Sequence, residues 1–225
     1  MLIEQPPKVF RSLFPGVIWR LPQEEKTIYL TFDDGPVPGV TPFVLDLLEQ
    51  YGVKATFFCV GENVCKYPEL FEQIKKAGHQ IGNHTFNHIQ GFKCSTTDYL
   101  ENVERADEYI KSSFFRPPHG QFRISQLLKL KKKYKIILWD VISRDYNRKL
   151  SGEFVFNIVK EHVRNGSIVV FHDSLKAEKN VKYALPKAIE FLIQEGYRFE
   201  ALSSRTVEEE LILREEQEII PYGII

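Results

Sequence analysis

The sequence predicts an α/β fold in which helices cover a parallel sheet. Short apolar runs of β type alternate with helical patterns along the chain, as in folds built from β-α units. Continuous apolar runs such as IVVF (168–171) are typical of strands buried on both faces of a sheet. The sequence has no GxGxxG or GxxxxGK phosphate loop, which disfavours the nucleotide-binding open sheets. The pattern alone fits both a closed or nearly closed barrel and an open doubly wound sheet.

Seven strands are expected in regular alternation with helices. The first, over 27–32, precedes a helix over 41–51, with Thr41 as N-cap and Pro42 at the first helical position. A strand over 55–60 precedes a helix over 67–78, where Gly78 lies at the position of a C-terminal cap. The other strands are expected over 79–84, 114–118, 135–141, 167–173 and 197–202, the other helices over 95–112, 124–134, 152–165 and 184–196, and a charged final helix within 208–225.

Length and charge limit the classes of function. At 225 residues with 43% hydrophobic content, the chain is long enough for one sizeable core and short for two, so one domain over 1–225 is expected. Thirty basic residues balance thirty acidic ones, so no overall charge attracts nucleic acid or an anionic membrane. A neutral substrate fits better, since a polyanion requires a local patch. The cluster KLKKKYK (129–135) is expected to be a solvated face beside a helix C-terminus.

The N-terminal region predicts neither a signal peptide nor a membrane span. Prolines and basic residues interrupt its apolar residues, so no stretch reaches signal-peptide length, and no other segment approaches a spanning helix. Cys59, Cys65 and Cys94 are odd in number and lack a CxxC spacing, which disfavours a disulfide framework and a cysteine zinc site. The expected compartment is the cytoplasm, or the cell envelope if a natural leader is missing from the sequence.

Unusual polar residues follow five of the predicted strands. In a β/α barrel the carboxyl ends of the strands meet at one rim, where active sites of such folds lie. These residues are therefore expected to lie together. They are Asp33 and Asp34 after the first strand, His84 and His88 after the third, Arg116 after the fourth, Asp140 and Asp145 after the fifth, and His172 and Asp173 after the sixth.

Asp34, His84 and His88 are expected to bind one divalent metal ion. Adjacent aspartates after a buried strand repel each other, so a cation nearby or a raised pKa is required. The histidines of HTFNH (84–88) are four residues apart, and on one helical turn both would point the same way. A His-His-Asp set suits zinc, cobalt or nickel and leaves positions open for water and substrate. Asp33 is then free to take a proton from water. Taken alone, the histidines also fit a surface pair, and DDGP fits a turn.

Five segments in this order resemble the motifs of the polysaccharide deacetylase family, the NodB-homology enzymes of carbohydrate esterase family 4. They are TFDDGP (31–36), HTFNH (84–88), RPPHG (116–120), DY (145–146) and VFH (170–172). The resemblance covers about 27–202. It implies a distorted (β/α) barrel of about seven strands, similar to a TIM barrel. It also implies metal-dependent hydrolysis of N-acetyl groups from N-acetylglucosamine-containing glycans, or sometimes of O-acetyl groups from xylan.

The resemblance also implies a role for each matching residue. Asp33 resembles the general base and His172 the general acid. Arg116 resembles the residue that holds the base, and Asp145 the carboxylate that tunes the acid. Asp34, His84 and His88 match the metal ligands, for which Zn2+ is expected, with Co2+, Ni2+ or Mn2+ as alternatives. An acetylated glycan or oligosaccharide is the implied partner, and the residues expected to contact it are Pro118, His119, Gly120, Tyr146 and Phe171.

Three positions depart from the family pattern. His119 stands where an aromatic residue is usual, Ile142 where a further aspartate is frequent, and Tyr146 where tryptophan is frequent. His119 is interpreted as a residue behind the metal ligands, a substrate hydrogen-bonding group, or an exposed ring.

Asp173 is expected to orient its loop without binding metal. An O-acetyl esterase or amidase with a small non-glycan substrate, and a degenerate glycan-binding module, are alternative functions. The sequence makes no prediction of oligomeric state.

Overall fold

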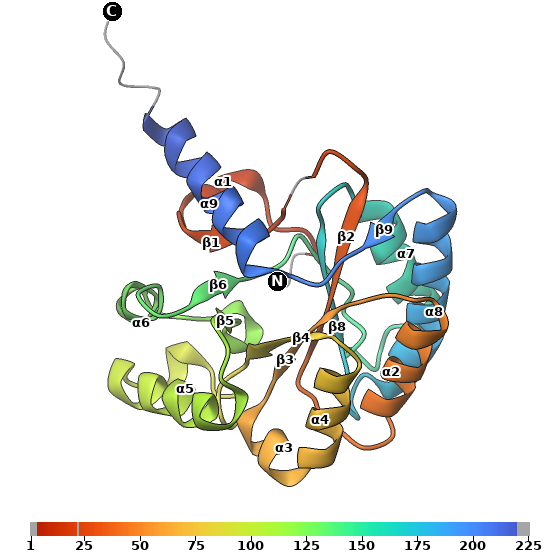
Figure 1. Cartoon of the computed structure of the whole chain (residues 1–225), viewed down its shortest axis with the longest axis horizontal. Coiled ribbons are helices and arrows are strands. Elements are labelled where there is room, and N and C mark those ends of the chain that lie inside the picture. The colour runs from red at the N-terminus through yellow and green to blue at the C-terminus, as the bar shows by residue number, and fades with distance from the viewer. Residues whose placement is uncertain (1–3, 22, 220–225) are drawn as a thin grey trace, which may run out of the picture.

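A computed structural model describes residues 4–21 and 23–219. Strands form a curled parallel sheet in the middle of the molecule, and helices surround it (Figure 1). Helices α2, α7 and α8 lie to the right in Figure 1, α3 and α4 lie below, and α5 and α6 lie to the left. The helices are α1 (Lys8–Ser12), α2 (Thr41–Gln50), α3 (Gly61–Lys66), α4 (Pro68–Lys76), α5 (Thr96–Ile110), α6 (Ile124–Leu130), α7 (Gly152–His162), α8 (Glu178–Gln194) and α9 (Ser204–Ile219), with 3-10 turns over Gly91–Lys93 and Pro118–Gly120.

The described residues form a nine-stranded sheet whose pairings are all parallel. Its order is β1-β6-β5-β4-β3-β2-β8-β7, and β9 pairs with β2. Parallel pairing follows from the helical crossovers between successive strands. The strands are β1 (Val17–Ile18), β2 (Thr27–Asp33), β3 (Thr56–Cys59), β4 (Gln80–Asn83), β5 (Phe114–Phe115), β6 (Lys135–Ile137), β7 (Val141–Ile142), β8 (Ile168–His172) and β9 (Arg198–Phe199).

One extended run, residues 135–142, connects the two sides of the curled sheet. Its first half, β6, pairs with β5 and β1, and its second half, β7, pairs with β8. Between them the amide of Leu138 donates to the carbonyl of Ile18, and the amide of Asp140 donates to that of Ile168. We call residues 135–142 the seam. Because the seam bonds to both sides, the sheet curls into a distorted (β/α) barrel, which confirms the predicted fold class.

Strand β2 is buried along its whole length. Ile28, Leu30 and Phe32 belong to the largest hydrophobic cluster, which also contains buried residues of α2 and α8. Tyr29 faces the opposite side and packs in a separate cluster with Phe58. Burial on both faces explains the continuous apolar sequence, and it confirms a parallel sheet between layers of side chains.

The order of predicted elements is confirmed, and several local predictions are wrong. Thr41 is not an N-cap: its hydroxyl accepts a hydrogen bond from the Val37 amide and donates to Asp173. The expected strand over 135–141 is two strands, because its halves pair with different neighbours. Strand β1 and helices α1 and α3 were not predicted. Gly78 does follow α4 with a φ of +75°, as the C-terminal cap requires. The last expected residues, 220–225, lie outside the described residues.

Within the residues that the structure describes, no helix has both the length and the apolar composition needed to cross a membrane.

Candidate metal centre and active site

The predicted site residues come from the carboxyl ends of neighbouring strands. Asp33 ends β2 and His172 ends β8, and the two are register partners in adjacent strands. His84 follows β4, and Arg116 follows β5. Parallel strands therefore bring four sequence-distant residues to one rim, where barrel folds place their chemistry.

Asp34, His84 and His88 lie together, with one donor atom of each within 4.8 Å of the others. Asp34 Oδ1 is 3.1 Å from His88 Nε2 and 3.8 Å from His84 Nε2. Two imidazole nitrogens and one carboxylate oxygen suit a divalent transition metal and leave coordination positions open. The donor set therefore fits one metal ion.

The expectation that HTFNH forms a helical turn is wrong. Residues 84–90 after β4 have no helical structure. Thr85 and His88 have φ values of +64° and +57°, so the chain reverses through left-handed residues. This reversal brings the two imidazole rings to a centroid distance of 5.1 Å. A loop, and not a helical turn, therefore brings the two histidines together.

Hydrogen bonding orients His84 for ligation. Its Nδ1 lies 2.7 Å from the Arg116 carbonyl, so Nδ1 carries the proton that it donates and Nε2 presents a lone pair to the triad. Burial lowers the pKa of His84 to about 4, so the ring is neutral near pH 7. Burial acts against ionisation of Asp34, yet the hydrogen bond with His88 and the nearby imidazoles hold its pKa well below the usual value. Both protonation states suit metal binding.

The backbone at the site is strained. Asp34, His88 and His119 have φ values of +85°, +57° and +59°, and such left-handed conformations cost about 1–2 kcal/mol each for residues with a Cβ. Strain of this kind persists only where surrounding contacts hold it. At Asp34 the carbonyl accepts a 2.7 Å hydrogen bond from the Asn63 side chain, which fixes the peptide plane.

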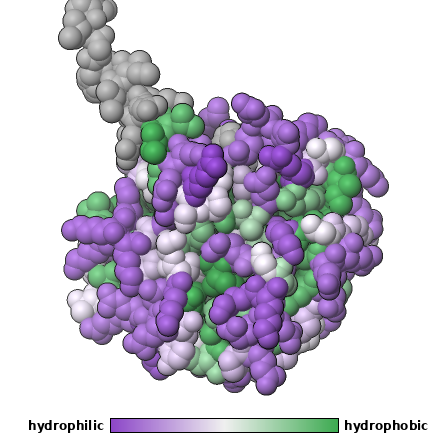
Figure 2. Space-filling model, in the orientation of Figure 1, coloured by the Kyte–Doolittle hydropathy of each residue, from purple (hydrophilic) through white to green (hydrophobic). Residues whose placement is uncertain are grey.

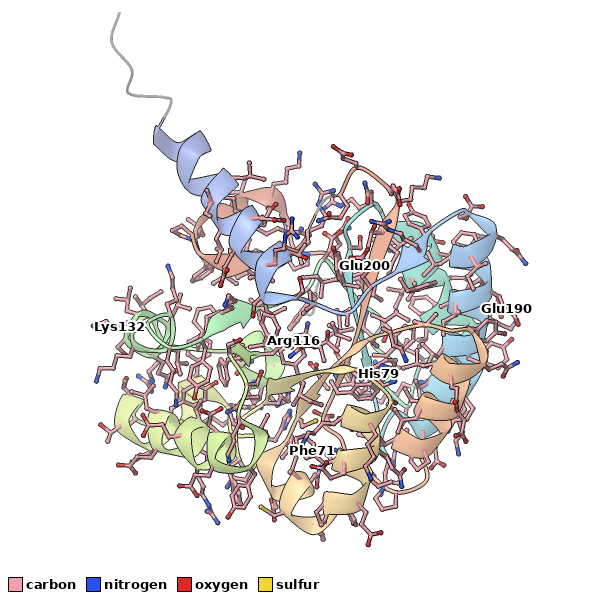
Figure 3. All side chains as sticks on the ribbon, in the orientation of Figure 1. Phe71, His79, Arg116, Lys132, Glu190 and Glu200 are labelled. Atoms are coloured by element: carbon pink, nitrogen blue, oxygen red, sulfur yellow. The ribbon has the colours of Figure 1, made fainter. Side chains whose placement is uncertain are left out.

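A buried Arg116 holds Asp33. Its Nη1 donates to Asp33 Oδ1 at 2.6 Å and to Thr31 Oγ1 at 2.8 Å. The remaining guanidinium nitrogens donate to the carbonyls of Ile137 and Leu138 in the seam. Figure 3 shows Arg116 in the middle of the molecule, and its side chain is fully buried. The Asp33 carboxylate is thereby fixed in one rotamer and balanced by a cation.

His172 pairs with Asp145. His172 Nδ1 lies 2.7 Å from Asp145 Oδ1, and the His172 amide donates to Asp145 Oδ2 at 2.7 Å. Burial lowers the pKa of His172, but the Asp145 carboxylate, together with the nearby Asp34 and Asp33, outweighs it, so the pKa rises to about 9. At neutral pH the ring is an imidazolium that can give up a proton from Nε2.

Two supporting residues complete the rim. Asp173 accepts hydrogen bonds from the Gly35 amide at 3.0 Å and the Thr41 hydroxyl at 2.6 Å, so it ties β8 to the loop that carries Asp34, in agreement with its expected orienting role. Asn180 was missed: its side-chain amide donates to the Asp145 carbonyl at 3.0 Å. The sequence carried no signal for it, because Asn180 precedes the helix expected over 184–196 and its burial is evident only from the structure.

We expect Gly35→Ala to destabilise the protein by about 3 kcal/mol, because a Cβ on Gly35 would overlap the buried Asp173 carboxylate and overpacking costs about 1–3 kcal/mol. The matched change Gly39→Ala, at a φ of +81° with no described atom within 4 Å, should cost about 1 kcal/mol from backbone strain alone. Urea denaturation measures both. Equal losses would show that the contact with Asp173 does not constrain the loop.

The residues expected to contact substrate fall into two groups. His119 is exposed, and its ring packs edge-on against His88 at 4.8 Å, beside the metal triad. Tyr146 is half-buried, and its ring meets His172 at 4.9 Å. Gly120 is half-buried, and Pro118 is buried. The Phe171 side chain is fully buried beside Phe32, so the structure does not bring it to the substrate side.

Asp140 does not lie at the rim, contrary to expectation. Its carboxylate is fully buried and pairs with Arg11 at 2.5 Å and with Arg164 at 2.7 Å. The Ser167 hydroxyl also donates to it at 2.7 Å. Asp140 pairs through its backbone with Ile168, the first residue of β8, so it lies near the amino end of that strand and is held by structural ion pairs.

Comparison with known proteins decides the family. A profile described as polysaccharide deacetylase matches residues 20–136. The chain is 37% identical over 194 residues to a peptidoglycan-N-acetylglucosamine deacetylase of Bacillus cereus, covering 83% of this chain and 91% of that protein. The chain belongs to the polysaccharide deacetylase family.

Other members of the polysaccharide deacetylase family agree in fold and sequence. A chitooligosaccharide deacetylase of Azorhizobium caulinodans is 34% identical and covers 70% of this chain and 79% of that protein. The crystal structure of the Bc1960 peptidoglycan N-acetylglucosamine deacetylase in complex with 4-naphthalen-1-yl-N-oxidanyl-benzamide superimposes with a TM-score of 0.80 at 31% identity, over 88% of this chain and 95% of that one. The resemblance inferred from five motifs is therefore confirmed.

Proposed function

We propose that this polysaccharide deacetylase family member removes N-acetyl groups from N-acetylglucosamine-containing glycans by metal-dependent hydrolysis. One observation carries the proposal: a carboxylate held by an arginine and an imidazolium held by a carboxylate lie on adjacent strands beside one His-His-Asp triad. The named activities of the Bacillus cereus and Azorhizobium caulinodans relatives support this substrate class.

Asp34, His84 and His88 would hold the metal ion. Bound there, a divalent ion would polarise an acyl carbonyl and make water more acidic. Zn2+ fits two imidazoles and one carboxylate, and Co2+, Ni2+ and Mn2+ accept the same donors. The preferred metal is identified by measuring the activity of the metal-free protein after reconstitution with each ion.

Asp33 acts as the general base. Arg116 holds its Oδ1, which leaves Oδ2 to accept the proton of an attacking water. His172 acts as the general acid: Asp145 fixes Nδ1, so the Nε2 proton passes to the leaving nitrogen as the C–N bond breaks. His119, which packs against His88, and Tyr146, which packs against His172, contact the sugar.

Two alternatives use the same rim. An O-acetyl esterase or an amidase with a small non-glycan substrate requires the same base, acid and metal. A degenerate glycan-binding module has no need of a fixed base and a fixed acid, so the complete set disfavours it.

Acetate release tests the proposal. N-acetylglucosamine oligomers, peptidoglycan and acetylated xylan are each incubated with the metal-loaded protein, and acetate is measured. Release from the first two substrates supports N-deacetylation of glycans. Release from xylan alone assigns an O-acetyl esterase, and sugar binding without release from any substrate assigns a binding module.

The pH profile should respond to Asp145. A raised pKa means that His172 is protonated at neutral pH and loses its proton as the pH passes about 9, so acid catalysis declines on the alkaline side. In Asp145→Asn the carboxylate that favours the imidazolium is gone. We expect the alkaline limb of kcat/KM to move to lower pH by at least about one unit, with the acid limb and metal content unchanged.

Asp46→Asn is the matched control for that profile, since it removes an exposed carboxylate on α2 and should leave both limbs in place. An alkaline limb that does not move in Asp145→Asn would exclude His172 as the acid that this limb reports.

A further inference from the structure

A large cationic cavity lies apart from the metal triad. It has a volume of about 770 Å³, and the described side chains that line it include nine lysines and arginines and one carboxylate, Glu210. Its walls come from α1, the residues on either side of β1, the turn between α6 and β6, the residue Arg164 before β8, and α9. No residue of the metal triad is among the described residues that line it. Most of the residues that line the cavity come before strands in the sequence, whereas the residues of the metal triad come after strands.

The segments that line the cavity can be located in the figures. Figure 1 shows α6 at the left and the pair α1 and α9 above it, with β1 and β6 between them. Figure 2 shows hydrophilic residues interspersed with hydrophobic ones on this side of the molecule. In Figure 3, Lys132 lies at the outer left edge of the molecule, well away from Arg116 in the middle. The chain is neutral overall, so this excess of positive charge is local.

Some of the lining cations are already paired. Arg11 and Arg164 share the buried Asp140, and Arg214 pairs with Glu210. Lys133 and Lys135 reach single carboxylates, Asp107 and Glu208 respectively, outside the cavity lining.

Lys8, Arg20 and Lys132 have no carboxylate within 4 Å in the described part of the chain. The closest hydrogen bond of the Arg20 side chain is a long one, 3.4 Å, to the Asn165 carbonyl. Burial and the neighbouring Arg164 lower the pKa of Arg20, and the more weakly acting carboxylates of Asp140 and Glu210 offset this only in part. A cation held among other cations, with free donors, is stabilised by an external anion.

Trp19 supplies a second, independent observation. Its side chain lines the cavity, is only 2% exposed, and its indole N–H has no acceptor among the described residues. Buried donors of this kind are nearly always paired. An oxygen-rich ligand in the cavity would accept from the guanidinium of Arg20, the residue that follows Trp19 in the cavity wall.

We propose that this cavity binds an anion that carries at least two phosphate groups. Lys8, Arg20 and Lys132 come from three separate wall segments, so one monovalent anion cannot balance them. Phosphate groups supply several acceptor oxygens and more than one charge each, and they match the forked donors of arginine. The same phosphate chemistry occurs in soluble bisphosphates and in anionic lipid headgroups. The proposal does not depend on the deacetylase activity, because the two sites share no lining residue.

Calorimetric titration of the metal-loaded protein with fructose bisphosphate tests the site. We expect one-to-one binding to the parent, and about tenfold weaker binding to Arg20→Gln and to Lys132→Gln, the loss expected for one charge-assisted hydrogen bond. Lys129→Gln is the matched control: it removes an equal charge from the same basic cluster at an exposed position that does not line the cavity. Its affinity should equal that of the parent within about twofold.

Two further arms identify the source of the phosphate. Vesicles of phosphatidylcholine and cardiolipin, a lipid whose headgroup carries two phosphates, are compared with vesicles of phosphatidylcholine alone in sedimentation assays. Binding to the anionic vesicles that is lost in Lys132→Gln supports the site and assigns it to a headgroup, whereas binding of fructose bisphosphate alone supports the site and assigns it to a soluble ligand. Absence of both, equal losses in Lys129→Gln and Lys132→Gln, or equally tight binding of a tricarboxylate would overturn the proposal.

Discussion

Replacement of His84 by alanine is expected to remove the metal ion and to lower kcat/KM by at least about 10³-fold. The metal ion contributes several kcal/mol of transition-state stabilisation, and each 1.36 kcal/mol corresponds to about a tenfold change in rate. Of the three proposed ligands, His84 is the one best fixed by its surroundings, since it is 2% exposed and bonded to the Arg116 carbonyl. Elemental analysis of the purified proteins, together with acetate release, measures both effects.

His162→Ala is the control for this experiment. It removes a half-buried imidazole from the end of α7, outside the rim, and should leave metal content and turnover unchanged. Equal metal content in the parent and in His84→Ala would exclude the triad as the metal site, even if activity were lost.

The second large effect is expected in Asp33→Asn, which should retain the metal and lose about 10²–10⁴-fold in kcat. Asparagine preserves the shape of the side chain and can still accept from Arg116, but it cannot take a proton. The measurement is kcat in parallel with metal content, and Asp46→Asn on the outside of α2 controls for loss of an unrelated carboxylate.

The assignment of two adjacent aspartates to two roles depends on this variant. Asp33 Oδ2 lies 3.9 Å from His84 Nε2, and Asp34 Oδ1 lies 3.8 Å from the same atom, so distance to His84 does not separate them. The hydrogen bond that Asp33 accepts from Arg116 distinguishes the two carboxylates. Loss of metal from Asp33→Asn would make Asp33 a ligand, and a near-normal rate would place the base elsewhere.

The fold was predictable where local pattern and tertiary pairing agree. Strand β2 and helix α4 with Gly78 at its end carry complete local signals. The seam lacks a complete local signal, because its split into β6 and β7 depends on which strands lie on either side of it. Thr41 was misread for a similar reason: its hydroxyl is used by Asp173, which is 132 residues away in sequence.

The site was predictable in composition and less so in geometry. Motif order identified the residues of the triad, whereas their approach depends on left-handed residues in the loop after β4. Asp140 shows the limit of the rule that polar residues after strands meet at one rim. The seam crosses from β5 to β8, so a residue in its middle lies near the amino end of β8. Likewise, Lys8, Arg20 and Lys132 meet only in three dimensions, which no local count of charge predicts.

The seam links the order of the active site to the opening of the barrel. Arg116 holds Asp33 while its other nitrogens bond to the Ile137 and Leu138 carbonyls, and the amides of Leu138 and Asp140 bond to β1 and β8. Any fluctuation that detaches the seam exposes those two amides to exchange with deuterium and, in the same event, frees the guanidinium. The exchange protection of these two amides therefore measures the free energy that separates molecules in which Arg116 holds the Asp33 carboxylate from molecules in which it does not.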